Sequence, residues 1–344
     1  MKINDILKEI NQLSDKEQNL IKNLLQQNII NDHSLEDVIT NERFKNGRVC
    51  PNCSSVEKIV RFGKTKGGVQ RYKCNNCGQT FVASTNSVIS KTHYGLDVWE
   101  KYIECMLQGL SVRKSAEICG IHRNTAFIWR HKILDALTEL IEKDTKLKGI
   151  IEADETFFNV SYKGNHSKSN FELPRAPKHR GTPATKRGLS REKVCVSCAI
   201  DRNGKSFSKI AALGRLNEET LEIVYKGRLK KKSVLCTDSL NAYIAFAQMS
   251  DLKLVQLKGG RVKNGIYHIQ HINSYHSRLK KFIRGFNGVS TKYLNNYLTW
   301  NCWVNVMKGS LGNKGDALLN SAVKSYMTVK SDQLSDRKVI PCVA

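Results

Sequence analysis

The sequence predicts a multidomain α/β protein in which a mixed sheet with flanking helices follows a small metal-binding module and a pair of helices. Three observations predict this class. Two Cys-x2-Cys pairs stand in a short polar segment at 48–82, a helical pattern runs from 94 to 145, and strand and helix patterns alternate from 149 to 309. A hairpin followed by strands that alternate with helices favours a mixed sheet covered by helices.

The overall charge favours a polyanionic partner. The 344 residues include 56 Lys and Arg against 31 Asp and Glu, a formal net charge of +25, and each cation set against a phosphate releases condensed counterions. A hydrophobic content of 40% argues against disorder, and no apolar run approaches the roughly 18 residues of a membrane span. The charged N-terminus is not typical of a signal peptide. We therefore expect an intracellular protein that handles nucleic acid.

The excess charge is unevenly distributed along the chain. Residues 1–45 carry a net charge of −2, whereas 46–92 carry +7 and 150–344 carry +19. Between Asp251 and Asp316 there are 11 Lys or Arg and no acidic residue at all. A charge run is usually a solvated face, but the length of this acid-free segment indicates a surface that holds a polyanion.

Residues 1–45 are expected to be a helical N-terminal segment. Apolar side chains recur at helical spacing over 3–30, and Ser14 is placed to cap a second helix. A small helical hairpin follows from this pattern, with no chemistry indicated for it.

Four of the 11 cysteines predict a zinc site. Cys50 and Cys53 form one Cys-x2-Cys turn, and Cys74 and Cys77 form a second turn 20 residues later. Tetrahedral zinc takes four thiolates, and each turn presents two of them from one tight loop. The alternative, four free structural cysteines, does not explain the paired spacing.

The other cysteines are expected to be small buried side chains. Cys195 and Cys198 have the same spacing but lie within a predicted strand, where positions i and i+3 face opposite sides. No second pair accompanies them, so packing is favoured over metal binding or redox chemistry. Four further cysteines fit the same interpretation: Cys105, Cys119, Cys236 and Cys302.

The stretch 109–134 predicts a helix-turn-helix. Ala116, Gly120 and Ile121 are small or apolar where two short helices would pack around a turn. The second helix would offer Arg123 and Asn124 near its start to base edges or phosphates. An ordinary helical pair inside a core is the alternative, and the neighbouring cysteine module and the net charge favour DNA binding.

The pattern after residue 148 predicts the following elements, in chain order: a strand at 149–158, a basic loop at 160–192, a hairpin built on Asn203-Gly204 over 194–213, a helix at 217–230, a strand at 233–238, a helix at 239–249, a strand at 253–257, and helices at 272–285 and 290–309.

Two carboxylates are placed on these strands where a metal site needs rigid ligands. Asp154 lies within IIEADETFF and Asp238 ends VLCTD, and phosphoryl transfer by two metal ions needs oxygen ligands that converge on cations roughly 4 Å apart. Either acid alone would be an ordinary surface carboxylate. Glu152 shares the face of Asp154, and Glu155 is expected to point the other way, so the strand leaves the choice of ligand open.

A third acidic ligand cannot come from the acid-free segment. Its helix at 272–285 instead places Asn273 and Lys280 seven residues apart on one face, opposite an apolar stripe. An asparagine carbonyl can coordinate Mg²⁺, and Lys280 could hold a phosphate beside it. Taken alone, Asn273 would be interpreted as a helix cap.

At this point the residues resemble a known family, the bacterial insertion-sequence transposases of the DDE superfamily. The resemblance is to a branch in which Asn replaces the third acid and is followed by Lys, the D-D-N-K variant. It covers residues 48–305, and the matching pieces are the cysteine pairs at 50–77, IEADET, LCTDSLNAY and, most specific, HIQHINSYHSRLKKFIRGFNGVSTKYLNNYLTW.

The resemblance implies a ribonuclease-H-like catalytic domain that cleaves DNA and transfers strands. Carried over residue by residue, Asp154, Asp238 and Asn273 would bind catalytic Mg²⁺ or Mn²⁺, and Lys280 would act with them by contacting DNA. The family's commoner pattern has Glu at the position of Asn273, which puts the strength of the second metal site in question. His268 and His276 also lie in the motif, with phosphate contact the only role considered.

The domains expected on this basis are a helical segment at 1–45, a zinc ribbon at 46–90, a helix-turn-helix region at 91–147, the catalytic domain at 148–310 and a C-terminal tail at 311–344. The zinc would be structural. The DNA-binding residues expected in the helix-turn-helix and acid-free segment are Arg123, Asn124, Arg130, Arg278, Lys280, Lys281 and Arg284.

The expected partner is double-stranded DNA, both element ends and target, in a bacterial cytoplasm at the nucleoid. Synapsis of two ends implies at least a dimer, and no membrane is involved. Two other functions remain open from the sequence: a non-catalytic DNA-binding regulator or inactive transposase, and a metal-dependent nuclease that cuts without joining.

Overall fold

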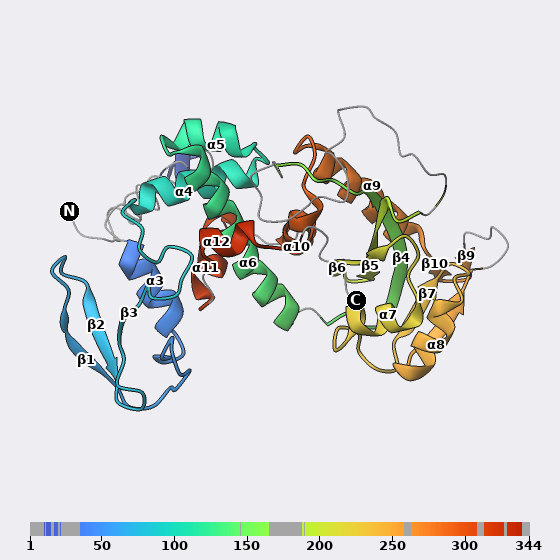
Figure 1. The fold of residues 1–344 in the computed structure, drawn as a ribbon, viewed down its shortest axis with the longest axis horizontal. Helices are drawn as coiled ribbons and strands as arrows, with labels where there is room; N and C mark the ends of the chain where they lie inside the picture. Colours follow the sequence, from blue (N-terminus) through green and yellow to red (C-terminus); the bar gives the residue numbers. More distant parts are fainter. Residues whose placement is uncertain are drawn as a thin grey trace. The chain divides into compact units, whose positions relative to one another are not determined.

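The computed structural model describes residues 35–144, 146–164, 188, 190–257, 263–307, 313–326 and 329–338, with a few residues before 35. The chain forms two compact units, one made of residues 1–85 and 89–99 and the other of residues 86–88 and 100–344 (Figure 1). The helical hairpin expected at 3–30 and most of the basic loop at 160–192 lie outside the described residues.

The described residues of the first unit include a helix and a three-stranded antiparallel sheet of order β1-β2-β3. Its elements are α3 (Leu35–Phe44), β1 (Ile59–Lys64), β2 (Gln70–Cys74) and β3 (Thr80–Val82). The small core consists of Tyr72 and Phe81 with two of the cysteines, and the ring of Phe44 packs edge-on against Tyr72 at 5.1 Å between centroids. So little apolar surface cannot hold a sheet alone, which agrees with a metal-stabilised module.

The expected helix-turn-helix is present in the second unit. After α4 (Leu96–Leu107), α5 (Val112–Cys119) begins at Ser111, whose hydroxyl accepts a hydrogen bond from the Lys114 N–H. It ends at Gly120, which has the left-handed φ of 64° that glycine adopts without strain. The next helix, α6 (Arg123–Asp144), is 22 residues long rather than short, because no glycine or proline interrupts it.

The second unit is built on a five-stranded mixed sheet of order β6-β5-β4-β7-β8. The strands are β4 (Ile150–Asn159), β5 (Lys193–Asp201), β6 (Ser206–Leu213), β7 (Val234–Thr237) and β8 (Lys253–Gln256). The pairs β4–β5 and β5–β6 are antiparallel, and β4–β7 and β7–β8 are parallel. This confirms the expected ribonuclease-H-like mixed sheet, with β4 at its centre.

Helices cover both faces of this sheet (Figure 1). The helices are α7 (Glu218–Tyr225) and α8 (Ala242–Met249) on one face, and α9 (Gln270–Arg284) and α10 (Leu294–Val306) on the other, with the short strands β9 (Lys263–Asn264) and β10 (Tyr267–His268) preceding α9. The parallel strands β7 and β8 are joined through α8, since parallel neighbours need a crossover connection and cannot be joined by a tight turn.

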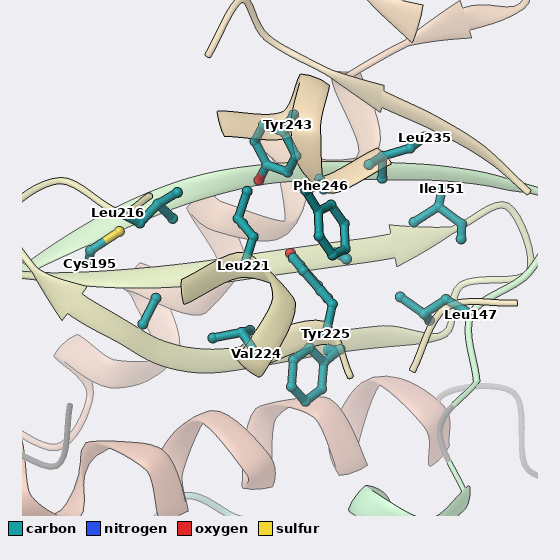
Figure 2. Packing of buried hydrophobic residues seen from close by; sticks show 14 residues of the cluster. Leu147, Ile151, Cys195, Leu216, Leu221, Val224, Tyr225, Leu235, Tyr243 and Phe246 are labelled. Carbon is teal, nitrogen blue, oxygen red and sulfur yellow. The ribbon is translucent and has the colours of Figure 1, made fainter. Parts of the chain in front are cut away.

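The main apolar core lies between the sheet and the first of these helical layers (Figure 2). Ile151 of β4, Leu235 of β7, and Tyr225 and Phe246 of the two helices are at most 3% exposed there. Since side chains alternate along a strand, the odd-numbered residues of β4 enter this core and the even-numbered ones face α9.

The segment expected as a C-terminal tail is partly helical, which corrects the sequence interpretation. It contains α11 (Lys314–Lys324) and α12 (Ser331–Ser335). α11 packs against α6 and buries Leu318 and Val323 completely. Leu318, Leu319, Ala322 and Val323 recur at helical spacing and form the buried face of α11, so the segment itself carries a helix signal that the interpretation as a tail left out.

Among the described residues, no helix combines the length and the apolar character that crossing a bilayer would require.

Substituting Gly120 tests the turn between α5 and α6. We expect Gly120→Ala to lower the free energy of unfolding by about 1 kcal/mol, because an alanine Cβ strains a left-handed backbone while no other atom lies within 4 Å of its position. Gly120→Asn adds a Cβ too but tolerates this conformation, so its loss should be smaller. Urea unfolding measures both, and equal losses would contradict the conformational cause.

Candidate active site and metal centre

The four cysteines of the first unit converge on one point. The Sγ atoms of Cys50 and Cys77 lie 3.7 Å apart, as do those of Cys53 and Cys74, and all four fall within 4.8 Å of one another. A tetrahedron with Zn–S bonds of about 2.3 Å has edges of about 3.8 Å, far longer than a disulfide. The arrangement therefore fits a structural zinc ion.

The two turns shape this site through their backbones. The N–H of Ser54 bonds to the Cys50 carbonyl, and the N–H of Gly78 bonds to the Cys74 carbonyl, so the two halves of the site repeat one geometry. The backbone N–H of Gln79 is the main cause that lowers the pKa of the Cys77 thiol to about 6. A thiolate is the form that binds zinc.

Five of the six cysteines expected to be buried outside the cluster are buried, and the sixth is half-buried. Cys195 and Cys198 are completely buried within β5, Cys105, Cys236 and Cys302 are buried in other elements, and Cys119 is half-buried.

The carboxylates of Asp154 and Asp238 lie close together where β4 extends beyond the end of β7. The two strands are parallel, with Glu152 opposite Cys236 as their last pair, so Asp154 and Asp238 stand at the same level two residues further on. Oxygens of Asp154, Glu155 and Asp238 all lie within 4.8 Å of one another. An all-oxygen donor set of this kind suits Mg²⁺ or Mn²⁺ rather than zinc.

Glu155 was expected to point to the opposite face of the strand from Asp154, and it does so, but its carboxylate still reaches the other two acids. Glu155 does start from the opposite face of β4, where its Oε1 accepts a hydrogen bond of 2.6 Å from the hydroxyl of Tyr243 in α8. Since β7 has ended at this level, no strand separates the two faces along that edge of β4. Side chains from both faces can therefore reach the same point.

Crowding of these acids changes their ionisation. Burial is the main cause that raises the pKa of Asp154 to about 6. The negative charge of Asp238 adds to this shift, and the charge of Lys280 opposes it. Burial also raises the pKa of Glu155 to about 7, with Asp154 and Asp238 adding to it. Carboxylates that are buried close together bind protons more readily unless a cation balances their charge, so this arrangement indicates a cation site.

Helix α9 lies against the acids with polar residues. His276 Nδ1 is 3.8 Å from Asp154 Oδ2, and burial together with Lys280 lowers the pKa of His276 to about 4. Asn273 is exposed within the first turn, where its N–H bonds to the carbonyl of Ile269, the residue that precedes the helix. Asn273 is thus inside the helix and is not its cap.

Most of the residues expected to bind DNA are at the surface. Arg123 and Asn124 are exposed at the start of α6. Four cations are exposed along α9: Arg278, Lys280, Lys281 and Arg284.

Arg130 is the exception among the expected DNA contacts. It is 1% exposed, donates to the carbonyl of Leu110 at 2.7 Å, and lies over the rings of Phe286 and Trp300. Its place in the protein interior removes it from the candidate DNA contacts.

Two features of the site were not found from the sequence. Glu152 is 1% exposed and accepts hydrogen bonds from the start of α9, although its position on the face of Asp154 was noted. Arg202, at the β5–β6 turn, lies 3.2 Å from Glu152, and no sequence signal connects residues so far apart.

Comparisons with known families identify two regions of the chain. Residues 146–303 match the ISXO2-like transposase domain, and residues 30–80 match the transposase zinc-ribbon domain. A protein described as uncharacterized, in transposable element ISH50 of Halobacterium salinarum, is 23% identical over 273 residues, which is 78% of this chain and 89% of that protein. Two regions of the chain, in this order, are therefore similar to a transposase zinc ribbon and to an ISXO2-like transposase domain.

Solved structures with some similarity include a simian T-cell lymphotropic virus intasome in complex with the PP2A regulatory subunit B56 gamma. It has a TM-score of 0.26 and 12% identity, over 46% of this chain and 48% of that one. The pre-cleavage Mos1 transpososome has a TM-score of 0.21 and 9% identity over 67% and 80% of the two chains. The Mos1 strand transfer complex has 0.23 and 11% over 66% and 76%.

Removing one cysteine tests the zinc site. We expect the wild-type chain to carry about one zinc ion, and Cys74→Ser to lose most of it, because three thiolates and a hydroxyl bind zinc far more weakly. Cys119→Ser, outside the cluster, should retain the metal. Elemental analysis after gel filtration measures both, and unchanged zinc in Cys74→Ser would exclude the assignment.

Without added divalent cations, the acidic cluster should make the folded state less stable as the pH rises. Folded-state pKa values of about 6 and 7 for Asp154 and Glu155 exceed the usual 3.8 and 4.5, so the folded state binds more protons between these limits. Their contribution to stability is complete below pH 4 and is lost as the pH rises through 7.

Glu155→Gln removes one of these charges and keeps an acceptor for Tyr243. The difference in the free energy of unfolding between Glu155→Gln and wild type should shift in favour of the variant by about 1–3 kcal/mol from pH 5 to pH 8, since one pKa unit corresponds to about 1.4 kcal/mol. Urea unfolding at the two pH values gives the difference. Glu117→Gln, on the exposed surface of α5, should show no such change, and a pH-independent difference for Glu155→Gln would contradict the cause given.

Proposed function

We propose that this protein is a Mg²⁺- or Mn²⁺-dependent DNA transposase that recognises the ends of an insertion sequence, cleaves phosphodiester bonds and joins the 3′ ends to target DNA. One observation carries the proposal: the carboxylates of Asp154 and Asp238 converge within a region that matches the ISXO2-like transposase domain. We further propose a bacterial insertion sequence and the D-D-N-K variant of the active site.

The residues proposed to hold the catalytic cations are Asp154, Asp238 and Asn273. Divalent cations held by these residues would supply activation of the attacking hydroxyl and stabilisation of the leaving oxygen, so one site would serve both hydrolysis and joining. Lys280 completes the group, because its charge acts on Asp154 and is free of any acidic neighbour within the segment 252–315. An ammonium there favours the approach of a phosphodiester.

The DNA contacts are proposed to divide by function. The zinc ribbon and the exposed Arg123 and Asn124 would recognise the element ends, since base edges are read from the start of a helix. The exposed cations of α9 would hold the backbone near the cleavage site, which explains the concentration of charge in the second unit. Pairing of two ends requires at least a dimer.

Asp238→Asn tests this function. We expect Mg²⁺-dependent cleavage and joining of an oligonucleotide that carries the element end to fall by about 100-fold or more, because the substitution removes a charged ligand at constant volume. DNA affinity should persist. Asp251→Asn makes the same change at an exposed turn and should leave both reactions intact.

The cleavage product and the joined product distinguish a transposase from the two alternative functions. Cleavage without joining in the wild-type protein would indicate a nuclease. Binding without cleavage in wild type, unaffected by Asp238→Asn, would indicate a DNA-binding regulator or an inactive transposase.

A further inference from the structure

Glu152 is a buried carboxylate that holds the start of α9. Its Oε2 accepts hydrogen bonds from the backbone N–H groups of His271, at 2.8 Å, and Ile272, at 3.0 Å. The first amides of a helix have no carbonyl partner within it, and Ile269, which precedes the helix, provides no side-chain cap. Glu152 therefore caps α9 from a strand that is more than a hundred residues away in the sequence.

The charge of this carboxylate is neutralised on every side. Its Oε1 lies 2.7 Å from His271 Nδ1 and 3.2 Å from Arg202 Nη1, and the positive end of the α9 dipole faces Oε2. Only 1% of Glu152 is exposed, and a buried charge is tolerated when it is paired and hydrogen-bonded. The geometry of the cap is thus fixed by strong, charge-assisted bonds.

The cation of this cluster is the Arg202 guanidinium. Glu152, His268 and His271 are close enough together to hold a metal, but Arg202 Nη1 lies 2.7 Å from His268 Nε2 and 2.8 Å from His271 Nδ1. Nη2 also donates to the carbonyl of Ile266. Arg202 therefore ties the β5–β6 turn and the hairpin before α9 to the same carboxylate.

A second contact fixes α9 to β4 further along both elements. His276 meets Asp154 at 3.8 Å, four residues after Ile272 on the helix and two residues after Glu152 on the strand. Four helical residues rise about 6 Å and two strand residues advance about 6.6 Å, so both contacts form with the two elements side by side. Along α9, Asn273 lies between Ile272 and His276.

We propose that Glu152 is a positioning residue for the catalytic site: by capping α9 it sets the place of the first helical turn, which carries Asn273, relative to β4, which carries Asp154. The inference rests on the proposed function, which assigns Asn273 to the metal site. Glu152 itself would not touch the metal or the DNA.

Glu152→Gln tests the role with nearly unchanged volume. If the glutamine oxygen accepts from His271 and Ile272, as Oε2 does, its uncharged NH2 group faces the Arg202 donor in place of Oε1, so the charge-assisted cap weakens. In protein without divalent cations, hydrogen exchange of the peptide spanning 268–276 should become faster. The Mn²⁺ concentration for half-saturation, read by electron paramagnetic resonance, and the Mg²⁺ concentration for half-maximal cleavage should both rise about tenfold or more.

Asp201→Asn is the matched control. Asp201 is also buried, at 3% exposed, and accepts two backbone N–H bonds, from Asn203 and Lys205, in the β5–β6 turn. Its substitution should lower the melting temperature without changing exchange in 268–276 or the metal requirement. DNA affinity should stay within about twofold of wild type in both variants.

A double variant shows whether Glu152 acts through Asn273. If it does, Glu152→Gln in an Asn273→Ala background should cause no further rise in the metal requirement, whereas independent effects would multiply. The inference is overturned if Glu152→Gln leaves exchange and metal requirement unchanged, if Asp201→Asn reproduces its effects, or if the double variant is multiplicative. Absence of both Mn²⁺ binding and cleavage in wild type would instead overturn the proposed function.

Discussion

The alternation of side chains along β4 is the constraint on which the rest of the second unit depends. β4 is the central strand, paired with β5 on one side and β7 on the other. Ile151 and Ala153 are completely buried in the apolar core, while Glu152 and Asp154 face α9. A slip of one residue would place two carboxylates in that core and turn the apolar pair toward the polar side chains under α9, at prohibitive cost. The register required by packing therefore also sets the position of the acids.

Local patterns were sufficient to predict the four-cysteine cluster and the place of Asp238 directly after a strand. The cysteine pairs are defined by spacing within two turns, and Asp238 by its place at the end of a short apolar strand. Both depend on a few consecutive residues, so their geometry follows from the sequence with little help from the rest of the fold.

Residues whose surroundings come from distant segments were not predictable in this way. Arg130 has the sequence context of an exposed recognition-helix cation, yet Phe286 and Trp300, more than 150 residues later, form its surroundings. Glu155 joins the acids only because β7 ends early beside it. The link between Glu152 and Arg202 similarly exists only once β4 and β5 have paired and α9 has docked.

The position of Glu155 also bears on why an asparagine can stand where related sites have a third acid. In the proposed site, two divalent cations bring four positive charges. Asp154, Glu155 and Asp238, with the scissile phosphodiester, bring four negative ones, so a glutamate at position 273 would add an excess charge. Asn273 supplies a carbonyl oxygen without that charge. The acid-free segment can then remain uniformly basic toward DNA, while the three carboxylates and the phosphodiester together balance the charge of the cations.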